Sequence, residues 1–131
     1  MIMFHVKTHL AESELQGIGL FSGEQIKKGT SIYSHNSELD INLSKEKFES
    51  LDSSDKKFIM HYGYFNIKTD KWHLSWDNIR FCNHSYKPNM QETGNKICAI
   101  RDIQKGEELT QNYEYFENPI RDSRGIKNTT N

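Results

Sequence analysis

The sequence predicts a mostly β fold with short helices, because short strand-like segments and turn signals recur around one stretch with helical spacing. Apolar and polar residues alternate over residues 3–7, which indicates a strand. The glycines of residues 17–21 (GIGLF) precede an apolar pair, so we expect a tight turn that enters a second strand. Lys28-Gly29 is a further turn signal, and residues 31–35 after it have the composition of a third strand.

The middle of the chain has helical spacing. Apolar residues recur there at Leu43, Phe48 and Leu51, and again at Phe58, Ile59 and Tyr62. The change begins at about Ser44, and Ser53 or Ser54 is expected to cap the second helical stretch. One or two helices are therefore predicted between the strands.

Strand character returns in the segments 62–67, 71–76, 97–103 and 108–110. Lys68-Thr69-Asp70 separates the first two and predicts a hairpin. Lys105-Gly106 separates the last two and predicts another turn.

A chain of 131 residues fits one compact domain, with a core over about residues 3–116 and a polar tail over residues 117–131. Seven Phe, six Tyr and two Trp supply large apolar groups for that core. The 17 Lys and Arg residues against 18 Asp and Glu give a net charge of −1. A protein that follows a phosphate backbone usually has a basic surplus, so direct nucleic-acid binding is not expected.

Cysteine usage and the absence of targeting signals predict a reducing compartment. Cys82 and Cys98 lack paired spacing and are expected to be free thiols. The sequence has no basic start followed by an apolar run, and no segment approaches 18 apolar residues. We therefore expect neither a signal peptide nor a membrane span. The expected location is cytoplasmic, or a host or chromatin compartment reached by a route that the sequence hides.

Three segments carry residue types suited to chemistry, namely residues 17–21, 80–89 and 106–113. Each has an ordinary structural explanation when it is taken alone. The glycine pair suits a turn with positive φ, Asn83-His84-Ser85 suits a polar loop, and Tyr113 suits a position in the core. Their order and separation along the chain make the three segments stronger evidence of function together than each is alone.

Together these segments resemble the SET-domain family of protein lysine methyltransferases. Residues 80–89 (RFCNHSYKPN) resemble the family's RFxNHSxxPN signature, and residues 106–113 (GEELTQNY) resemble its GEELTxxY signature. The resemblance covers about residues 3–116. It implies a SET-domain β-clip fold with a C-terminal pseudoknot, in which the C-terminal segment passes beneath a loop.

The resemblance also implies an activity, the transfer of a methyl group from S-adenosylmethionine (SAM) to the lysine amine of a protein or peptide, with S-adenosylhomocysteine as product. The residues that it implies bind the cofactor are Gly17, Ile18, Gly19, Arg80, Asn83, His84, Tyr113 and Phe116. Glycine allows the backbone to approach the methionine part of SAM, because it has no Cβ. The backbone amide and carbonyl near Asn83 and His84 offer the donor and acceptor that an adenine edge needs.

Tyr113 matches the family's catalytic tyrosine, and Tyr62 resembles its second active-site tyrosine, for which core packing is an equal explanation. Methyl transfer by direct displacement requires that the lysine nitrogen, the methyl carbon and the sulfur of SAM be aligned and that the lysine be neutral. It does not require a nucleophile on the protein. Apolar channel walls would lower the pKa of the substrate lysine, and Tyr64 and Trp76 are candidates for those walls.

Two features depart from the family pattern. Gln111-Asn112 precedes Tyr113 where the family usually has Tyr or Phe followed by Asp, and Gln111 is the position that lines the lysine pocket. Many relatives also carry a C-terminal cysteine-rich zinc segment that completes the substrate channel. Here Tyr115 and Phe116, or a second protomer, are expected to take its place, so a homodimer is expected.

Two other interpretations remain open. One is a SET-like module that binds SAM or a peptide with little or no turnover. The other is a metal site formed by His84, His73, Cys82 and Cys98, which their spacing does not demand. The substrate implied by the leading interpretation is a protein lysine, for example in a histone or a histone-like tail.

Overall fold

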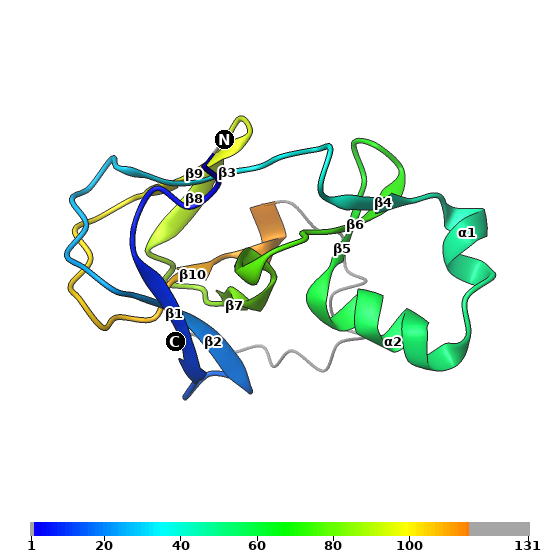
Figure 1. Ribbon diagram of the computed structural model, residues 1–131, viewed down its shortest axis with the longest axis horizontal. Helices are drawn as coiled ribbons and strands as arrows, with labels where there is room; N and C mark the ends of the chain where they lie inside the picture. Colours follow the sequence, from blue (N-terminus) through cyan, green and yellow to red (C-terminus); the bar gives the residue numbers. More distant parts are fainter. Residues whose placement is uncertain (1, 116–131) are drawn as a thin grey trace. The chain divides into compact units, whose positions relative to one another are not determined.

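The computed structural model describes residues 2–115 and divides them into two compact units (Figure 1). The first unit comprises residues 2–36 and 81–112, and the second comprises residues 37–80 and 113–115. No helix in residues 2–115 is long and apolar enough to cross a membrane. The expectation of a single domain stays a prediction.

The first unit is built from small sheets. Strands β1 (Thr8–Glu12) and β2 (Ile18–Ser22) form an antiparallel hairpin. Strands β3 (Ser31–Ser34), β9 (Lys96–Ala99) and β8 (Met90–Thr93) form an antiparallel sheet in that order. The buried apolar residues of this unit include Leu20, Ile26, Ile32, Tyr33, Met90, Ile97, Ile103 and Leu109.

A short parallel pair joins two distant segments of the first unit. Strand β7 (Asn83–His84) pairs with β10 (Thr110–Gln111), with Asn83 opposite Thr110 and His84 opposite Gln111. Ser85 N–H also donates to Gln111 O at 2.9 Å. The pairing brings residues 83–85, from the first matched signature, beside residues 110–111, from the second.

The second unit packs two helices beside a three-stranded antiparallel sheet, in the order β4 (Ile41–Leu43), β6 (Lys71–Leu74) and β5 (Tyr64–Asn66). The helices are α1 (Lys45–Glu49) and α2 (Ser53–Tyr62). Short 3₁₀ turns lie at Asn78–Phe81, where the chain leaves this unit, and at Tyr113–Tyr115. The buried apolar core consists of Phe48, Ile59, Phe65, Trp72 and Leu74. The rings of Phe48 and Trp72 stack with their centroids 4.3 Å apart, a geometry that adds about 0.5–1.5 kcal/mol to the burial of their area.

The mostly β fold with short helices is confirmed, and so is the hairpin around Lys68-Thr69-Asp70, where β5 pairs with β6. The predicted cap of the second helix was wrong. Asp52 is the N-cap of α2, because its carboxylate accepts a hydrogen bond from Asp55 N–H at 2.9 Å. Ser53 and Ser54 instead begin the helix.

The strand predicted over residues 3–7 is reduced to an isolated bridge, in which Phe4 pairs with Tyr33 and His5 N–H donates to Ile32 O at 2.8 Å, and β1 begins only at Thr8. The cause is not local, because the N–H of Lys7 donates at 2.7 Å to the carboxylate of Glu24, 17 residues away, instead of to a neighbouring strand. The strand predicted over residues 97–103 ends at Ala99. Ile103 forms a separate bridge with Ile26. The polar tail over residues 117–131 lies outside the described residues.

Candidate active site

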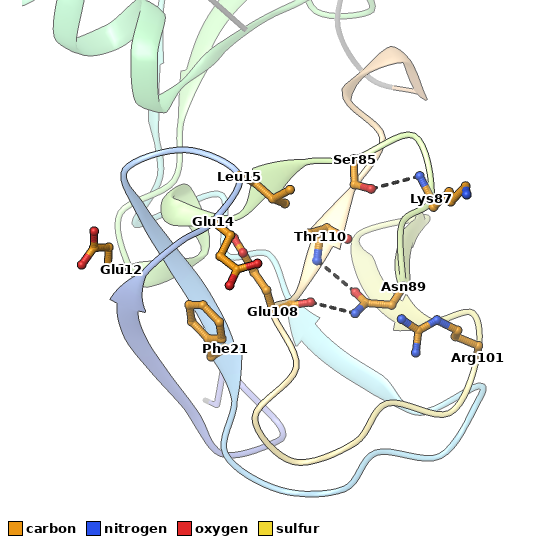
Figure 2. Close-up of a pocket in the computed structure, with 10 residues that line it drawn as sticks. All are labelled: Glu12, Glu14, Leu15, Phe21, Ser85, Lys87, Asn89, Arg101, Glu108 and Thr110. Carbon is orange, nitrogen blue, oxygen red and sulfur yellow. Dashed lines mark hydrogen bonds between the residues drawn. The ribbon is translucent and has the colours of Figure 1, made fainter. Parts of the chain in front are cut away.

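A pocket of about 420 Å³ opens in the first unit (Figure 2). Its walls come from the β1–β2 hairpin, the segment after β7 and the segment that leads into β10. The residues that line it are Glu12, Glu14, Leu15, Phe21, Ser85, Lys87, Asn89, Arg101, Glu108 and Thr110. The pocket therefore joins carboxylates, two basic side chains and apolar surface.

The loop between β1 and β2, residues 13–17, closes on itself; we call it the glycine loop. Ser13 N–H donates to Gly17 O at 2.7 Å. The Ser13 hydroxyl oxygen accepts hydrogen bonds from Leu15 N–H at 2.9 Å and from Gln16 N–H at 3.3 Å. Gly17 has φ of +48°, a conformation that most side chains rarely adopt, so glycine is needed at this turn.

Asn83 joins the glycine loop to the segment before β10. Its side-chain Nδ2 donates to Gln16 O at 3.0 Å and to the Glu108 carboxylate at 2.8 Å, and lies 3.4 Å from Ile18 O. The structure thus brings Asn83 to residues 16–18, as the resemblance implied. His84, which is buried, follows in β7.

Asn89 holds the wall of the pocket with both ends of its amide (Figure 2). Its Nδ2 donates to Glu108 O at 2.8 Å, and its Oδ1 accepts from Thr110 N–H at 2.9 Å. Asn89 and Glu108 stand in the two matched signatures, but the sequence analysis gave neither of them a role. Ser13, which bonds to Glu108, has no recognisable sequence signal.

Arg101 is held at the pocket by Glu107. Its guanidinium donates to the two carboxylate oxygens of Glu107 at 2.9 and 3.3 Å. These hydrogen bonds keep the pKa of Glu107 below its ordinary value. The pocket therefore has a positively charged group that an ion pair holds in place.

Both cysteines are free thiols, and Cys82 is unsuited to metal binding. Burial, and then the negative charge of Glu108, raise the pKa of Cys82 well above its ordinary value. Its Sγ lies 3.5 Å from Leu109 O. A metal needs the thiolate, which this environment disfavours.

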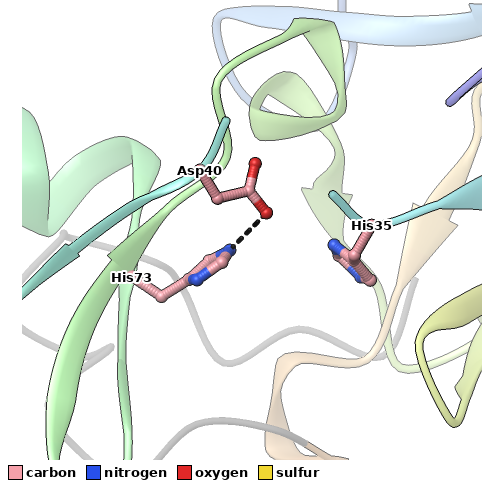
Figure 3. A group of neighbouring side chains, drawn as sticks. All are labelled: His35, Asp40 and His73. Carbon is pink, nitrogen blue, oxygen red and sulfur yellow. Dashed lines mark ion pairs between the residues drawn. The ribbon is translucent and has the colours of Figure 1, made fainter. Parts of the chain in front are cut away.

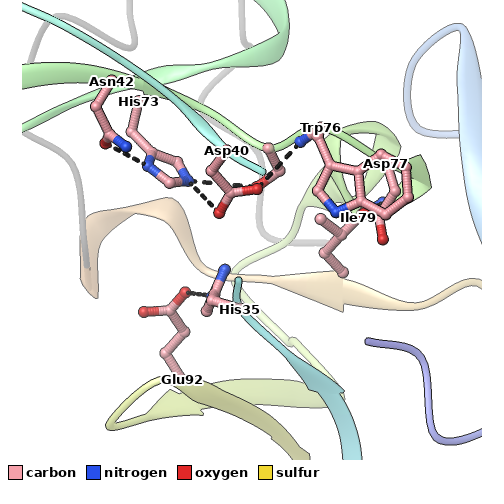
Figure 4. Close-up of polar contacts among 9 residues, drawn as sticks. His35, Asp40, Asn42, His73, Trp76, Asp77, Ile79 and Glu92 are labelled. Atoms are coloured by element: carbon pink, nitrogen blue, oxygen red, sulfur yellow. Dashed lines mark hydrogen bonds and ion pairs between the residues drawn. The ribbon is translucent and has the colours of Figure 1, made fainter. Parts of the chain in front are cut away.

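His73 of the proposed metal set belongs to the second unit and already has polar partners there. Its Nε2 lies 3.3 Å from the Asp40 carboxylate (Figure 3). Its Nδ1 lies 3.0 Å from the side-chain oxygen of Asn42, and Asp40 also accepts a hydrogen bond from Trp76 N–H at 3.2 Å (Figure 4). His73 thus has an ion-pair partner and a hydrogen-bond partner within the second unit.

The remaining predicted site residues lie mainly in the second unit. Tyr62 ends α2, contacts Phe58 with ring centroids 4.9 Å apart, and packs against the core of this unit. The Arg80 guanidinium lies 5.6 Å from the centre of the Phe58 ring. A packing role for Tyr62 therefore has direct support, whereas its catalytic role stays a prediction.

Tyr64 lies on β5 with its ring 5.1 Å from His73, and Trp76 is 42% exposed. Tyr113 begins the last 3₁₀ turn and is half-buried. Gln111 is buried in the first unit, where it pairs with His84. Phe116 lies outside the described residues.

Comparison with known proteins agrees with the two signatures. The model of the SET domain matches residues 17–114. A Debaryomyces hansenii protein named "Histone-lysine N-methyltransferase, H3 lysine-36 specific" is 32% identical over 114 residues, which cover 78% of this chain and 15% of that protein. The Homo sapiens "Histone-lysine N-methyltransferase 2D" is 27% identical over 115 residues, which cover 82% of this chain and 2% of that protein. The chain thus spans a small part of these relatives.

Solved structures show the same fold. An apo form of ctPRC2 with mutations in Ezh2 matches with a TM-score of 0.69 at 21% identity, over 91% of this chain and 16% of that chain. An autoinhibited conformation of ctPRC2 bound to SAM matches with a TM-score of 0.66 at 21% identity, over 90% of this chain and 16% of that chain. The family match over residues 17–114 and this shared fold lead to one conclusion: the chain belongs to the SET-domain family.

Proposed function

We propose that the chain is a SAM-dependent protein-lysine N-methyltransferase. The observation that carries the proposal is the set of hydrogen bonds by which Asn83 joins the glycine loop to Glu108, a junction of which Leu15 and Glu108 line the pocket. The names of the relatives, histone-lysine N-methyltransferases, support the reaction, and the SAM-bound neighbour supports the cofactor.

The residues of the pocket fit SAM. A volume of about 420 Å³ lies in the range of small-ligand sites. SAM carries a sulfonium and an ammonium, for which the carboxylates of Glu12 and Glu14 are suited partners. It also carries a carboxylate, for which Lys87 and Arg101 are suited partners.

When bound, SAM supplies a methyl group on a positively charged sulfur. The backbone of Gly17, Ile18 and Gly19 would hold the methionine part, and Asn83 with His84 would hold the cofactor elsewhere, including its adenine edge. The proposal extends to Arg80, Tyr113 and Phe116 as further cofactor contacts, and to Tyr64, Trp76 and Gln111 as walls of the lysine channel.

Tyr113 and Tyr62 are the proposed catalytic residues. Direct transfer needs an aligned acceptor nitrogen and no protein nucleophile, so orientation is the main contribution of the chain. A tyrosine oxygen can accept weak C–H···O contacts from a polarised methyl group. Aromatic walls keep the lysine amine neutral, because burial lowers the pKa of an amine.

The proposed substrate is a lysine of a histone or a histone-like protein, which follows the names of the relatives. Such a substrate would place the chain at chromatin. The homodimer expected from the sequence stays a prediction.

The proposal predicts that Asn83→Ala weakens SAM binding by about 1–3 kcal/mol, the cost of removing a partner from buried polar groups. The substitution leaves Gln16 O and Glu108 without the donor that joins them. Isothermal calorimetry with SAM and S-adenosylhomocysteine measures the effect, and the wild type should bind each at one site per chain.

Asn95→Ala, in the exposed turn between β8 and β9, is the matched control and should bind like the wild type. Absence of binding by the wild type at millimolar SAM would remove the cofactor from the proposal. Equal affinities for Asn83→Ala and wild type would remove Asn83 from the site.

A further inference from the structure

We infer that Glu108 is a positioning residue that fixes the glycine loop through a carboxylate that only accepts hydrogen bonds, and that it thereby sets the affinity for the cofactor. The second half of this inference rests on the proposed function. The first half concerns the ligand-free protein and is independent of it.

Two segments that are distant from Glu108 in sequence, the β1–β2 hairpin and β7, meet at this one carboxylate. The Ser13 hydroxyl, 95 residues away, lies 2.7 and 2.9 Å from its two oxygens. Asn83 Nδ2 donates to Oε2 at 2.8 Å. A Cβ at Gly19 would lie only 2.3 Å from Oε2, so the backbone of β2 passes directly against the same group.

Both partners of the carboxylate can act there only as donors. The Ser13 hydroxyl has one hydrogen and two lone pairs, and its oxygen already accepts from Leu15 and Gln16 N–H. Its single hydrogen is therefore available for position 108. The Nδ2 of Asn83 has no lone pair to offer. Position 108 must therefore accept from both partners, which an ionised glutamate does with two oxygens and no donor of its own.

Glutamine has nearly the same shape but holds the glycine loop less well. With its amide nitrogen at the position of Oε2, the nitrogen would face the Asn83 donor, and donor would meet donor. With its oxygen there, that oxygen could accept from both Ser13 and Asn83, but the 2.7 Å contact of Ser13 with Oε1 and the negative charge that strengthens both hydrogen bonds would be lost. A residue that mattered only for its volume would tolerate this substitution.

The experiment compares Glu108→Gln with Glu24→Gln. Glu24 is a matched control, because it accepts one hydrogen bond, from Lys7 N–H, which an amide oxygen can also accept. Hydrogen exchange of the Leu15 and Gln16 amides is measured in the ligand-free proteins. We expect exchange about tenfold faster in Glu108→Gln, from the loss of a hydrogen bond to a charged group, and no change in Glu24→Gln.

The same proteins are then titrated with SAM and assayed for transfer. Glu108→Gln should raise the Kd of SAM by about tenfold or more, while the rate at saturating SAM stays within about threefold, since the residue acts on binding. Unchanged exchange and unchanged Kd would overturn the inference. So would a fall in the saturated rate without a change in Kd.

Glu108→Ala gives a second test if Glu108→Gln does not fold, because it removes both acceptors of the carboxylate and leaves the Ser13 hydroxyl, the acceptor of the Gln16 amide, in place. Faster exchange of Gln16 in this variant would support the inference, and wild-type exchange would overturn it. If exchange is faster in Glu108→Gln than in the wild type, but the wild type does not bind SAM, the proposed function is refuted. The inference that Glu108 fixes the glycine loop would still stand.

Discussion

Tyr113→Phe should lower the rate of methyl transfer by at least tenfold while SAM affinity stays near that of the wild type. The substitution removes only the hydroxyl and keeps the half-buried ring. A tenfold loss corresponds to about 1.4 kcal/mol of transition-state stabilisation. An interaction used mainly in the transition state lowers turnover without a matching change in ground-state binding.

A single-turnover assay with a methylatable peptide measures this rate, beside a thermal melt of each protein. Tyr33→Phe is the control, because it also removes only a hydroxyl, from a fully buried ring that packs edge-to-face against Phe4. Its rate should stay within about twofold of the wild type. Equal rates for Tyr113→Phe and wild type would make Tyr113 a structural residue.

Gly63→Ala should lower the free energy of unfolding by about 2–3 kcal/mol, the upper part of the range for overpacking. Gly63 follows α2, and its N–H donates to Ile59 O at 2.8 Å. An added Cβ would lie 2.4 Å from His73 O and 2.8 Å from Ile59 O. Both are backbone atoms of the second unit, so relief requires that the helix end and β6 move apart.

Urea unfolding followed by circular dichroism measures the change. Lys57→Ala, at an exposed position of the same helix, is the control and should change stability by no more than about 0.5 kcal/mol. A Gly63→Ala protein as stable as the wild type would mean that this junction relaxes freely.

Turn and capping residues predict a helix or strand well where neighbouring residues in the sequence determine its ends. The hairpin at Lys68-Thr69-Asp70 followed from turn residues between two apolar segments, and β5 and β6 pair there. The cap of α2 was misplaced because Asp52, Ser53 and Ser54 are all good capping residues. The false strand at residues 3–7 shows the other limit, because a side chain 17 residues away, that of Glu24, takes the N–H of Lys7.

In the candidate site, too, some contacts could be predicted from the sequence and others could not. The meeting of residues 16–18 with Asn83 could be predicted, because the resemblance implies that Gly17 and Asn83 bind one cofactor, and the structure joins their segments. The Ser13–Glu108 contact could not, because no pattern in either segment indicates a partner 95 residues away. Tyr62 illustrates the ambiguity of an aromatic residue at helical spacing, which suits a core and a channel equally well.

The central claim is tested most directly by incubating the chain with labelled SAM and core histones, followed by mass-spectrometric mapping of the labelled residues. Our account predicts label on a lysine Nζ, and at least tenfold less of it with Tyr113→Phe in the same time. SAM binding without label on any lysine would contradict the claim, and the chain would then be a SET-domain binding module.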